Sequence, residues 1–304
     1  MNQQDPNQVY HDGQAEGYTG FTDCDANVYG WARSQLSPEQ VAQKTVIDFG
    51  CGQGSQTFSH LRENGAALLV GVEASEDMLK LVADYQNQIR REVDNISLEF
   101  LALITCFAEK EHFQLLIQGK MEEVSRVIPG TGDVGVNLFN VLCFDNPAEP
   151  IGDMRTVLKP GAPLVIVSNA FVDARIPLKA DDPYRSVPVD IHAAENGQEV
   201  ESGTVFRQVL HLVDDQGQPS PLALQDHIHT LGDYSRALPK DQWTIRSAEV
   251  FPPQGCTLID PQGTSPYLEL FNRPEFQKNP RLIHSGIQDA RLQYGKICIV
   301  AERS

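Results

Sequence analysis

The sequence has 304 residues, of which 41% are hydrophobic and 21% charged, as is ordinary for a globular enzyme with a sizeable core. A formal charge of −17 without clustered lysines and arginines argues against a nucleic-acid partner. The six cysteines form no Cys-x-x-Cys pair, which argues against a zinc site and a disulfide framework and favours a reducing compartment.

The chain opens on a polar stretch, MNQQDPNQ, which lacks the basic and apolar regions of a secretory signal. No apolar run approaches the length of a membrane span. These features predict a soluble, cytoplasmic protein that acts away from the membrane. We interpret the acidity as a solubility feature.

Strand-like and helix-like segments alternate through the first half of the chain, as buried apolar runs and capped amphipathic segments indicate. The expected strands cover residues 45–49, 67–73, 113–119, 133–144 and 162–169. The expected helices cover residues 37–44, 55–64, 75–89, 121–128 and 151–161, with an additional buried helix in 96–107. This alternation predicts a doubly wound α/β fold with a mostly parallel sheet, covered on both faces.

The second half has a different pattern. Two strand-like runs, 204–213 and 222–231, flank the turn DDQGQPSP and predict a hairpin. A short helix is expected at 235–238, and strands at 243–251 and 295–302. We expect a single domain over residues 1–304, with an N-terminal lid at about 1–36 and cap segments at about 95–112, 173–202 and 252–292.

The stretch VIDFGCGQGSQT places a bare glycine turn directly after a buried strand. In open α/β sheets, ligands bind beyond the carboxyl ends of the strands, where glycines allow a close approach. The spacing is G-x-G-x-G at Gly50, Gly52 and Gly54, whereas the dinucleotide fingerprint needs a further small residue where Ser55 stands. Asp48 at the entrance would repel a pyrophosphate but suits a ligand that carries an ammonium and a sulfonium.

The second strand ends in an acid, Glu73, which follows Gly54 at about the distance typical of a ribose-binding carboxylate. Its two oxygens can accept hydrogens from both ribose hydroxyls. This chemistry is common to dinucleotides and S-adenosylmethionine, so the acid alone is weak evidence for a cofactor site. Together with the glycine turn it is strong evidence.

Four stretches, VIDFGCGQGSQT, VGVEASEDML, DVGVNLFNVL and LKPGAPLVIV, together resemble the class I S-adenosylmethionine-dependent methyltransferases. The resemblance covers about residues 8–170 and, loosely, the final strand. It implies a Rossmann-like methyltransferase fold with a seven-stranded sheet whose last strand is antiparallel. It also implies S-adenosyl-L-methionine as the cofactor and transferase activity.

The resemblance further implies roles for single residues. Near the methionine part of the cofactor it places Gly50, Cys51, Gly52 and Gly54. Glu73 would hold the ribose, while Ala74 and Met78 would pack against the adenine. In the loop after the third strand Lys120 stands where the family usually has an acid, so Met121 or Glu122 would take over the adenine contact.

Two further positions follow from the same resemblance. The segment VYHDGQAEGYTGF is similar to the family's cap, and it places the ring of Tyr18 near the sulfonium, although packing of a lid helix would also explain an aromatic residue. Asn140, at the end of the fourth strand, stands where the family places a residue beside the transferred methyl. Its amide could contact the cofactor or orient a substrate.

His227 and His229 share one face of an expected strand, because side chains alternate along it. Either could act as a general base, since an unperturbed imidazole titrates near pH 6.5. Structural hydrogen bonding is the competing interpretation, and a metal site with Asp226 is disfavoured. We expect no metal.

The expected function is methyl transfer to a small-molecule metabolite, by direct attack of the acceptor on the sulfonium methyl. Two alternatives stay open. One is a non-methylating enzyme, a cyclase or lyase that releases methylthioadenosine, and the other is a non-catalytic cofactor-binding protein. The sequence leaves open whether the protein is a monomer or a homodimer.

Overall fold

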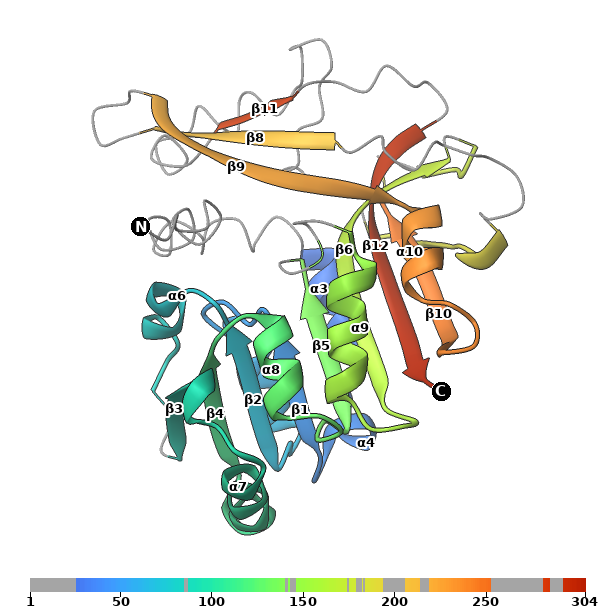
Figure 1. The fold of residues 1–304 in the computed structure, drawn as a ribbon. Coiled ribbons are helices and arrows are strands. Elements are labelled where there is room, and N and C mark those ends of the chain that lie inside the picture. The colour runs from blue at the N-terminus through green and yellow to red at the C-terminus, as the bar shows by residue number, and fades with distance from the viewer. Residues whose placement is uncertain are drawn as a thin grey trace.

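The computed structural model describes residues 26–84, 87–139, 142, 146–173, 175–178, 182, 184–193, 206–213, 219–252, 281–284 and 292–304 (Figure 1). Tyr18, Asn140 and much of the expected cap segments lie outside these residues. The boundaries expected for the lid and the caps therefore stay predictions. Among the described helices, none is long and apolar enough to cross a bilayer.

Twelve strands join one sheet in the described part of the chain. The strands are β1 (Thr45–Phe49), β2 (Leu68–Glu73), β3 (Gln88–Glu92), β4 (Phe113–Gln118), β5 (Val134–Leu138), β6 (Pro163–Asp173), β7 (Val187–Pro188), β8 (Phe206–Val213), β9 (Pro219–Thr230), β10 (Trp243–Phe251), β11 (Arg281–His284) and β12 (Leu292–Arg303). Their order is β11-β8-β9-β6-β5-β1-β2-β4-β3, with β12 beside β6, β10 beside β12 and β7 beside β10.

The order β4-β2-β1-β5-β6-β12-β10 forms the core of the sheet. From β4 to β6 the pairs are parallel, whereas β12 runs antiparallel to both β6 and β10. The mostly parallel sheet with an antiparallel last strand is therefore confirmed. Further strands extend it, with β3 at one edge, β7 at the other, and the β8–β9 hairpin with β11 beyond β6.

Central strands are mostly apolar because both faces of the sheet are covered, and Asp48 of β1 and Asn137 of β5 are buried polar exceptions. Every residue of β1 and β5 is buried. The described helices are α3 (Ala26–Ser34), α4 (Pro38–Val41), α5 (Phe58–Glu63), α6 (Glu76–Lys80), α7 (Leu98–Glu111), α8 (Met121–Val127), α9 (Ala148–Val157) and α10 (Leu231–Ala237), with a 3-10 turn at Val93–Asn95.

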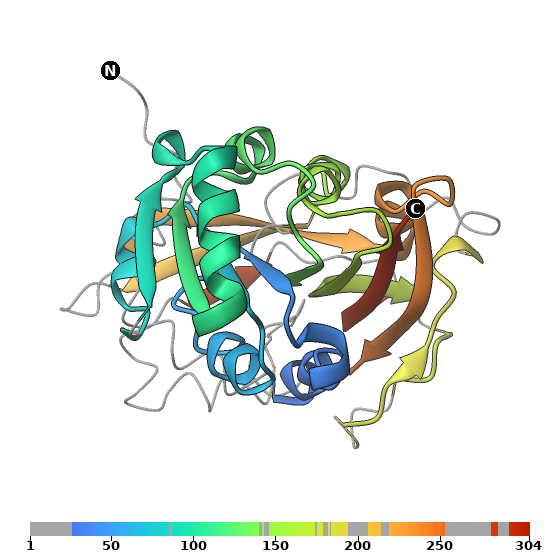
Figure 2. The ribbon, with the colours of Figure 1, turned by 90° about the horizontal axis from the view of Figure 1, so that it is seen from below.

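The helices divide between the two faces of the sheet (Figure 2). Side chains of α3, α4, α5 and α6 pack on one face with those of Val46, Val136 and Val167. Side chains of α7, α8, α9 and α10 pack on the other face with those of Ile47 and Ile166. The sheet therefore lies between two hydrophobic cores. The loops that follow the strands lie at the sheet edge formed by the strand ends.

The predicted helix over residues 75–89 is wrong in its second half. α6 ends at Lys80, and Gln88–Glu92 forms β3, which pairs in parallel with β4. Ile89 packs against the core, while Arg90, Arg91 and Glu92 are largely solvent-facing, as is typical of an edge strand. Pairing with β4 outweighs the local helical pattern here.

Two other expectations are confirmed. The additional helix forms as α7, which buries Leu101 and Ile104 but leaves Leu103 and Phe107 exposed. The hairpin forms as β8 and β9, and the end of β9 pairs with β6 through Ala170 opposite His229. The hairpin extends across the sheet beyond the carboxyl end of its parallel strands (Figure 1).

Candidate active site

The glycine turn lies at the carboxyl end of β1 and is fixed to the neighbouring strand. The amides of Gly50 and Cys51 donate to the carbonyl oxygen of Val72, at 2.8 and 3.0 Å. Gly50, Gly52 and Gly54 have φ of 74°, 53° and 69°, in the left-handed region that favours glycine. The predicted turn is therefore built with the backbone conformation that its sequence requires.

Gly54 is needed for packing as well as for conformation. A Cβ atom there would lie 2.3 Å from Cδ2 of Phe58, which no real contact allows. Phe58 begins α5 and is buried, so its ring cannot swing into solvent without opening the core. The turn and α5 can therefore pack closely only because residue 54 has no side chain.

Glu73 at the end of β2 links the glycine turn to the next helix. Its Oε2 accepts a hydrogen bond from the Gly52 amide and its Oε1 accepts one from the Ser75 amide, each at 2.9 Å. Ser75 in turn caps α6, where its Oγ accepts from the amide of Met78 at 3.2 Å. A carboxylate has about four acceptor positions, so these bonds leave capacity for ligand hydroxyls.

Asp48 is buried in β1, and the hydroxyl of Thr57 donates a hydrogen bond to its Oδ2. Burial raises the pKa of Asp48 to about 7, the bond from Thr57 opposes the increase, and the charge of Glu73 adds to it. Burial and the same two carboxylates also raise the pKa of the Cys51 thiol. A thiol that stays protonated is a poor nucleophile, so the surroundings of Cys51 do not favour a nucleophilic role.

Gln53, within the glycine turn, has a buried amide nitrogen without a hydrogen-bond partner. Buried donors of this kind are uncommon, because leaving one unsatisfied costs free energy. Gln53 stands between Gly52 and Gly54 in the sequence, and its side-chain nitrogen is a donor that a ligand carboxylate could use. Sequence reasoning missed this residue, since a glutamine between glycines carries no signal of its own.

The expected adenine contacts gather at the same edge of the sheet. The amide of Gly119 donates to the carbonyl of Glu73 at 3.1 Å, which brings the loops after β2 and β4 together. Met78 and Met121 are buried near the starts of α6 and α8. Glu122 is exposed on the first turn of α8, and Ala74 is half-buried. Their contact with a cofactor stays a prediction.

The chain leaves β5 through Phe139, which has a φ of 69° and donates its amide to the carbonyl of Val167 at 2.7 Å. The ring of Phe139 meets Tyr29 of α3 edge-on, with centroids 5.6 Å apart. The next residue, Asn140, lies outside the described residues, so its expected role beside the methyl group is untested.

His229 is buried at the end of β9. Its Nε2 lies 2.8 Å from the carbonyl oxygen of Leu142, and its ring meets Tyr234 edge-on at 6.1 Å. Because a carbonyl can only accept, Nε2 must carry the proton. His227 is described only by its backbone, which pairs with Arg207. The structure thus gives His229 a structural contact, and its role as a base stays a prediction.

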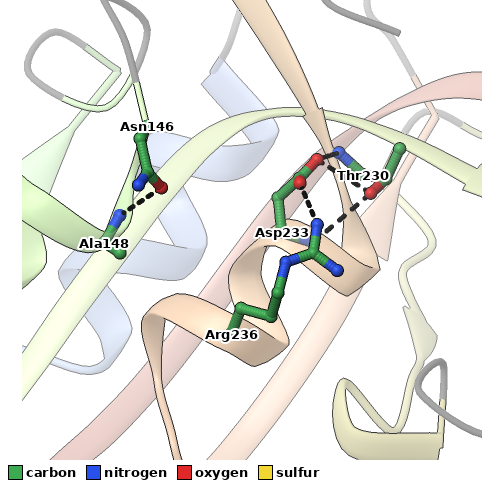
Figure 3. Close-up of polar contacts among 5 residues, drawn as sticks. All are labelled: Asn146, Ala148, Thr230, Asp233 and Arg236. Atoms are coloured by element: carbon green, nitrogen blue, oxygen red, sulfur yellow. Dashed lines mark hydrogen bonds and ion pairs between the residues drawn. The ribbon is translucent and has the colours of Figure 1, made fainter. Parts of the chain in front are cut away.

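Hydrogen bonds fix the residues that precede α10 and α9 (Figure 3). Thr230 caps α10: its hydroxyl and amide both donate to Oδ2 of Asp233, at 2.8 Å, and Arg236 pairs with the same carboxylate. Asn146 precedes α9 and accepts from the amide of Ala148 at 3.2 Å. The described residues contain no group of three or more His, Cys, Asp or Glu side chains that could hold a metal.

Comparisons with known proteins agree with this geometry. A family profile described as a methyltransferase domain matches residues 40–200. No match was found among curated protein sequences. Among solved structures, one chain of a Haloferax volcanii complex between a methyltransferase activator and a candidate methyltransferase superposes with a TM-score of 0.53, at 10% identity over 97% of this chain and 96% of that one.

Two further solved structures show lower TM-scores. A candidate S-adenosylmethionine-dependent methyltransferase from Listeria monocytogenes gives 0.49, at 17% identity over 92% of this chain and 97% of that one. A geranyl diphosphate C-methyltransferase from Streptomyces coelicolor, bound to S-adenosyl-L-homocysteine, gives 0.48, at 14% identity over 91% and 76%. At these identities the similarity concerns the fold.

Proposed function

The chain belongs to the S-adenosylmethionine-dependent methyltransferase family, and on that premise we propose that it methylates a small-molecule acceptor. The observation that carries the proposal is the hydrogen bond of 2.9 Å from the Gly52 amide to Oε2 of Glu73. It joins the two sequence signals of the cofactor site, the glycine turn and the acid after β2, into one structural unit.

The residues present fit S-adenosylmethionine, which supplies a methyl group on a positively charged sulfur. Asp48 and Glu73 bring two carboxylates to one turn, where their negative charge would attract a cationic ligand. The unsatisfied nitrogen of Gln53 offers a donor to the carboxylate of the same ligand. The positive-φ glycines keep side chains out of the path of approach.

The chain's contribution to the reaction is expected to be positioning. Glu73 would fix the ribose, the glycine turn the methionine part, and the loop that begins at Phe139 the acceptor. Alignment of two reacting groups can lower a barrier by about 7–11 kcal/mol in favourable cases. A strongly acidic sequence without basic clusters favours a small acceptor over a nucleic acid.

Thermal shift with single ligands tests the cofactor, because a ligand at about 100 times its Kd stabilises by about 2.7 kcal/mol. S-adenosylmethionine and S-adenosylhomocysteine should stabilise the protein and nicotinamide dinucleotides should not. Stabilisation by a dinucleotide alone would overturn the assignment.

Mass spectrometry of the products then tests the reaction. Adenosylhomocysteine together with a methylated acceptor is expected. Methylthioadenosine instead would show that the enzyme cleaves its cofactor at another carbon, and the absence of any product with a bound cofactor would favour a binding protein.

A further inference from the structure

Lys296 is a buried cation at the carboxyl end of the parallel strands. It lies in β12 opposite Asn169 of β6 and Phe251 of β10, and it is 3% exposed. Among the described residues, it is the one lysine or arginine that is buried. Taking an ammonium out of water is costly and must be offset by nearby groups.

The ammonium lies beside the loop that leaves β5. Its Nζ is 4.5 Å from the centroid of the Phe139 ring, a distance at which the ring face attracts a cation. Phe139 follows directly on β5, whose Asn137 donates from Nδ2 to the carbonyl of Phe49 at 2.7 Å, just before the glycine turn. Lys296 therefore contacts the residue that follows β5, a strand that is hydrogen-bonded to the end of β1.

The residues around β12 become less buried and more polar from Cys298 towards Lys296. Cys298, two residues further on, shares its face of the strand and packs in the apolar core with Val167 and Trp31. At the Lys296 end, by contrast, the neighbours Phe139 and Asn169 are only half-buried. The lysine thus lies where the core gives way to a partly open, mixed aromatic and polar surface.

We propose that Lys296 binds a carboxylate of the methyl acceptor, an inference that rests on the function proposed above. The site combines one ammonium with the aromatic face of Phe139 and the amide of Asn169. A single ammonium matches the single charge of a carboxylate, whereas phosphate sites usually gather several donors, often from arginine. The aromatic rings of Phe139 and Tyr29 suit an acceptor whose remaining part is apolar.

The net charge of −17 does not conflict with an anionic acceptor. Surface charges are screened over about 8 Å at physiological ionic strength, while a buried pair is screened much less. The local charge at Lys296 therefore decides binding more than the charge of the whole surface does.

The test uses the full chain with S-adenosylmethionine and a panel of small carboxylic acids, their primary amides and phosphate monoesters. Formation of adenosylhomocysteine is measured for the wild-type protein and for Lys296→Met and Lys296→Gln. Acids should be methylated in preference to their amides. Both variants should raise KM for the best acid by about 10- to 100-fold, as the loss of one charge-assisted hydrogen bond implies.

Lys159→Met is the matched control, because Lys159 makes an exposed ion pair with Asp133 at the opposite end of β5. It should leave KM unchanged. Thermal shift by the best acid, in the presence of S-adenosylhomocysteine, provides a reading without turnover and should be lost in both Lys296 variants. Lys296→Arg, which keeps the charge, should retain part of the thermal shift by the best acid.

The outcomes separate this inference from the proposed function. If wild-type protein does not bind S-adenosylhomocysteine, the proposed function itself is wrong. If it binds but prefers amides or phosphate monoesters, or if the Lys296 variants keep a wild-type KM for the acid, the carboxylate inference alone is overturned.

Discussion

The backbone amide of Gly52 donates a hydrogen bond of 2.9 Å to Oε2 of Glu73, so the carboxylate expected to hold the ribose also supports the glycine turn. The same side chain receives the Ser75 amide on its other oxygen. One carboxylate therefore sets the geometry of both loops that face the cofactor. Ligand binding and loop order are coupled through it.

Glu73→Ala should weaken S-adenosylhomocysteine binding by more than tenfold and also lower the stability of the free protein. Hydrogen bonds to charged groups contribute about 1.5–3 kcal/mol, and the variant loses two of them within the protein. Calorimetric titration measures the affinity, and denaturant unfolding measures the free energy of unfolding. Wild-type affinity in a folded variant would remove Glu73 from the site.

Gln53→Leu should weaken cofactor binding without destabilising the free protein. The buried Nε2 of Gln53 has no hydrogen-bond partner, so replacing the amide by an apolar group removes an unsatisfied donor. We expect an unfolding free energy equal to or above that of the wild type, and a Kd for S-adenosylmethionine raised by about 10- to 100-fold, as for one lost hydrogen bond to a charged group. An unchanged Kd would show that the donor does not face the ligand.

Gly54→Ala should disrupt the turn and prevent cofactor binding. The added Cβ would meet the Phe58 ring at 2.3 Å, and the residue would keep a positive φ of 69°. Gly130→Ala is the control, since Gly130 also has a positive φ, of 65°, but has no atom within 4 Å of the added Cβ. The control should lose about 1–2 kcal/mol of stability and keep full affinity. Equal affinities in the two variants would contradict the role of the turn.

Asp48 should make stability depend on pH in a definite direction. Its pKa in the folded protein is raised from 3.8 to about 7, so the folded state keeps a proton that the unfolded chain loses. Its contribution to the free energy of unfolding is therefore full below about pH 4 and is lost as the pH rises through 7. In Asp48→Asn, whose amide resembles the protonated acid, this loss should vanish. Unfolding curves from pH 4 to 8 for both proteins would show the difference.

Cofactor binding should release a proton from Asp48. A positively charged ligand favours the ionised carboxylate and lowers its pKa, against the burial and the Glu73 charge that raise it. The affinity for S-adenosylmethionine should thus increase between pH 6 and 8, more in the wild type than in Asp48→Asn. Calorimetry in two buffers of different ionisation enthalpy would count the proton. A pH-independent affinity in both proteins would place Asp48 away from the ligand's charge.

The sequence was sufficient to predict the central strands and the cofactor turn because these signals are local. A short, mostly apolar run with β-branched residues such as TVIDF is typical of a strand covered on both faces, and glycines at alternate positions favour an unusual backbone. Asp48 and Glu73 follow from their places at the ends of β1 and β2. These residues meet in the structure as the motif implies.

The remaining features depend on contacts between distant parts of the chain. β3 forms because Ile89 can pair beside Leu115, which outweighs a helical pattern that begins correctly at α6. Lys296 stands in a run that predicts an ordinary buried strand, and only the fold brings it against Phe139. The missing partner of Gln53 is likewise visible only in three dimensions.

His229→Phe gives the last prediction, because it separates a structural histidine from a catalytic one. The substitution keeps a ring of similar size beside Tyr234 but removes the donor to the carbonyl of Leu142, a fully buried residue. An unsatisfied buried carbonyl should lower the free energy of unfolding by about 1–3 kcal/mol. His229→Gln, which can still donate, should recover part of the loss. Cofactor affinity should stay at the wild-type value in both variants, and turnover should fall less than tenfold. A general base would behave differently, with turnover reduced by about 10²–10⁴ and stability unchanged, and steady-state kinetics beside thermal unfolding would distinguish the two roles.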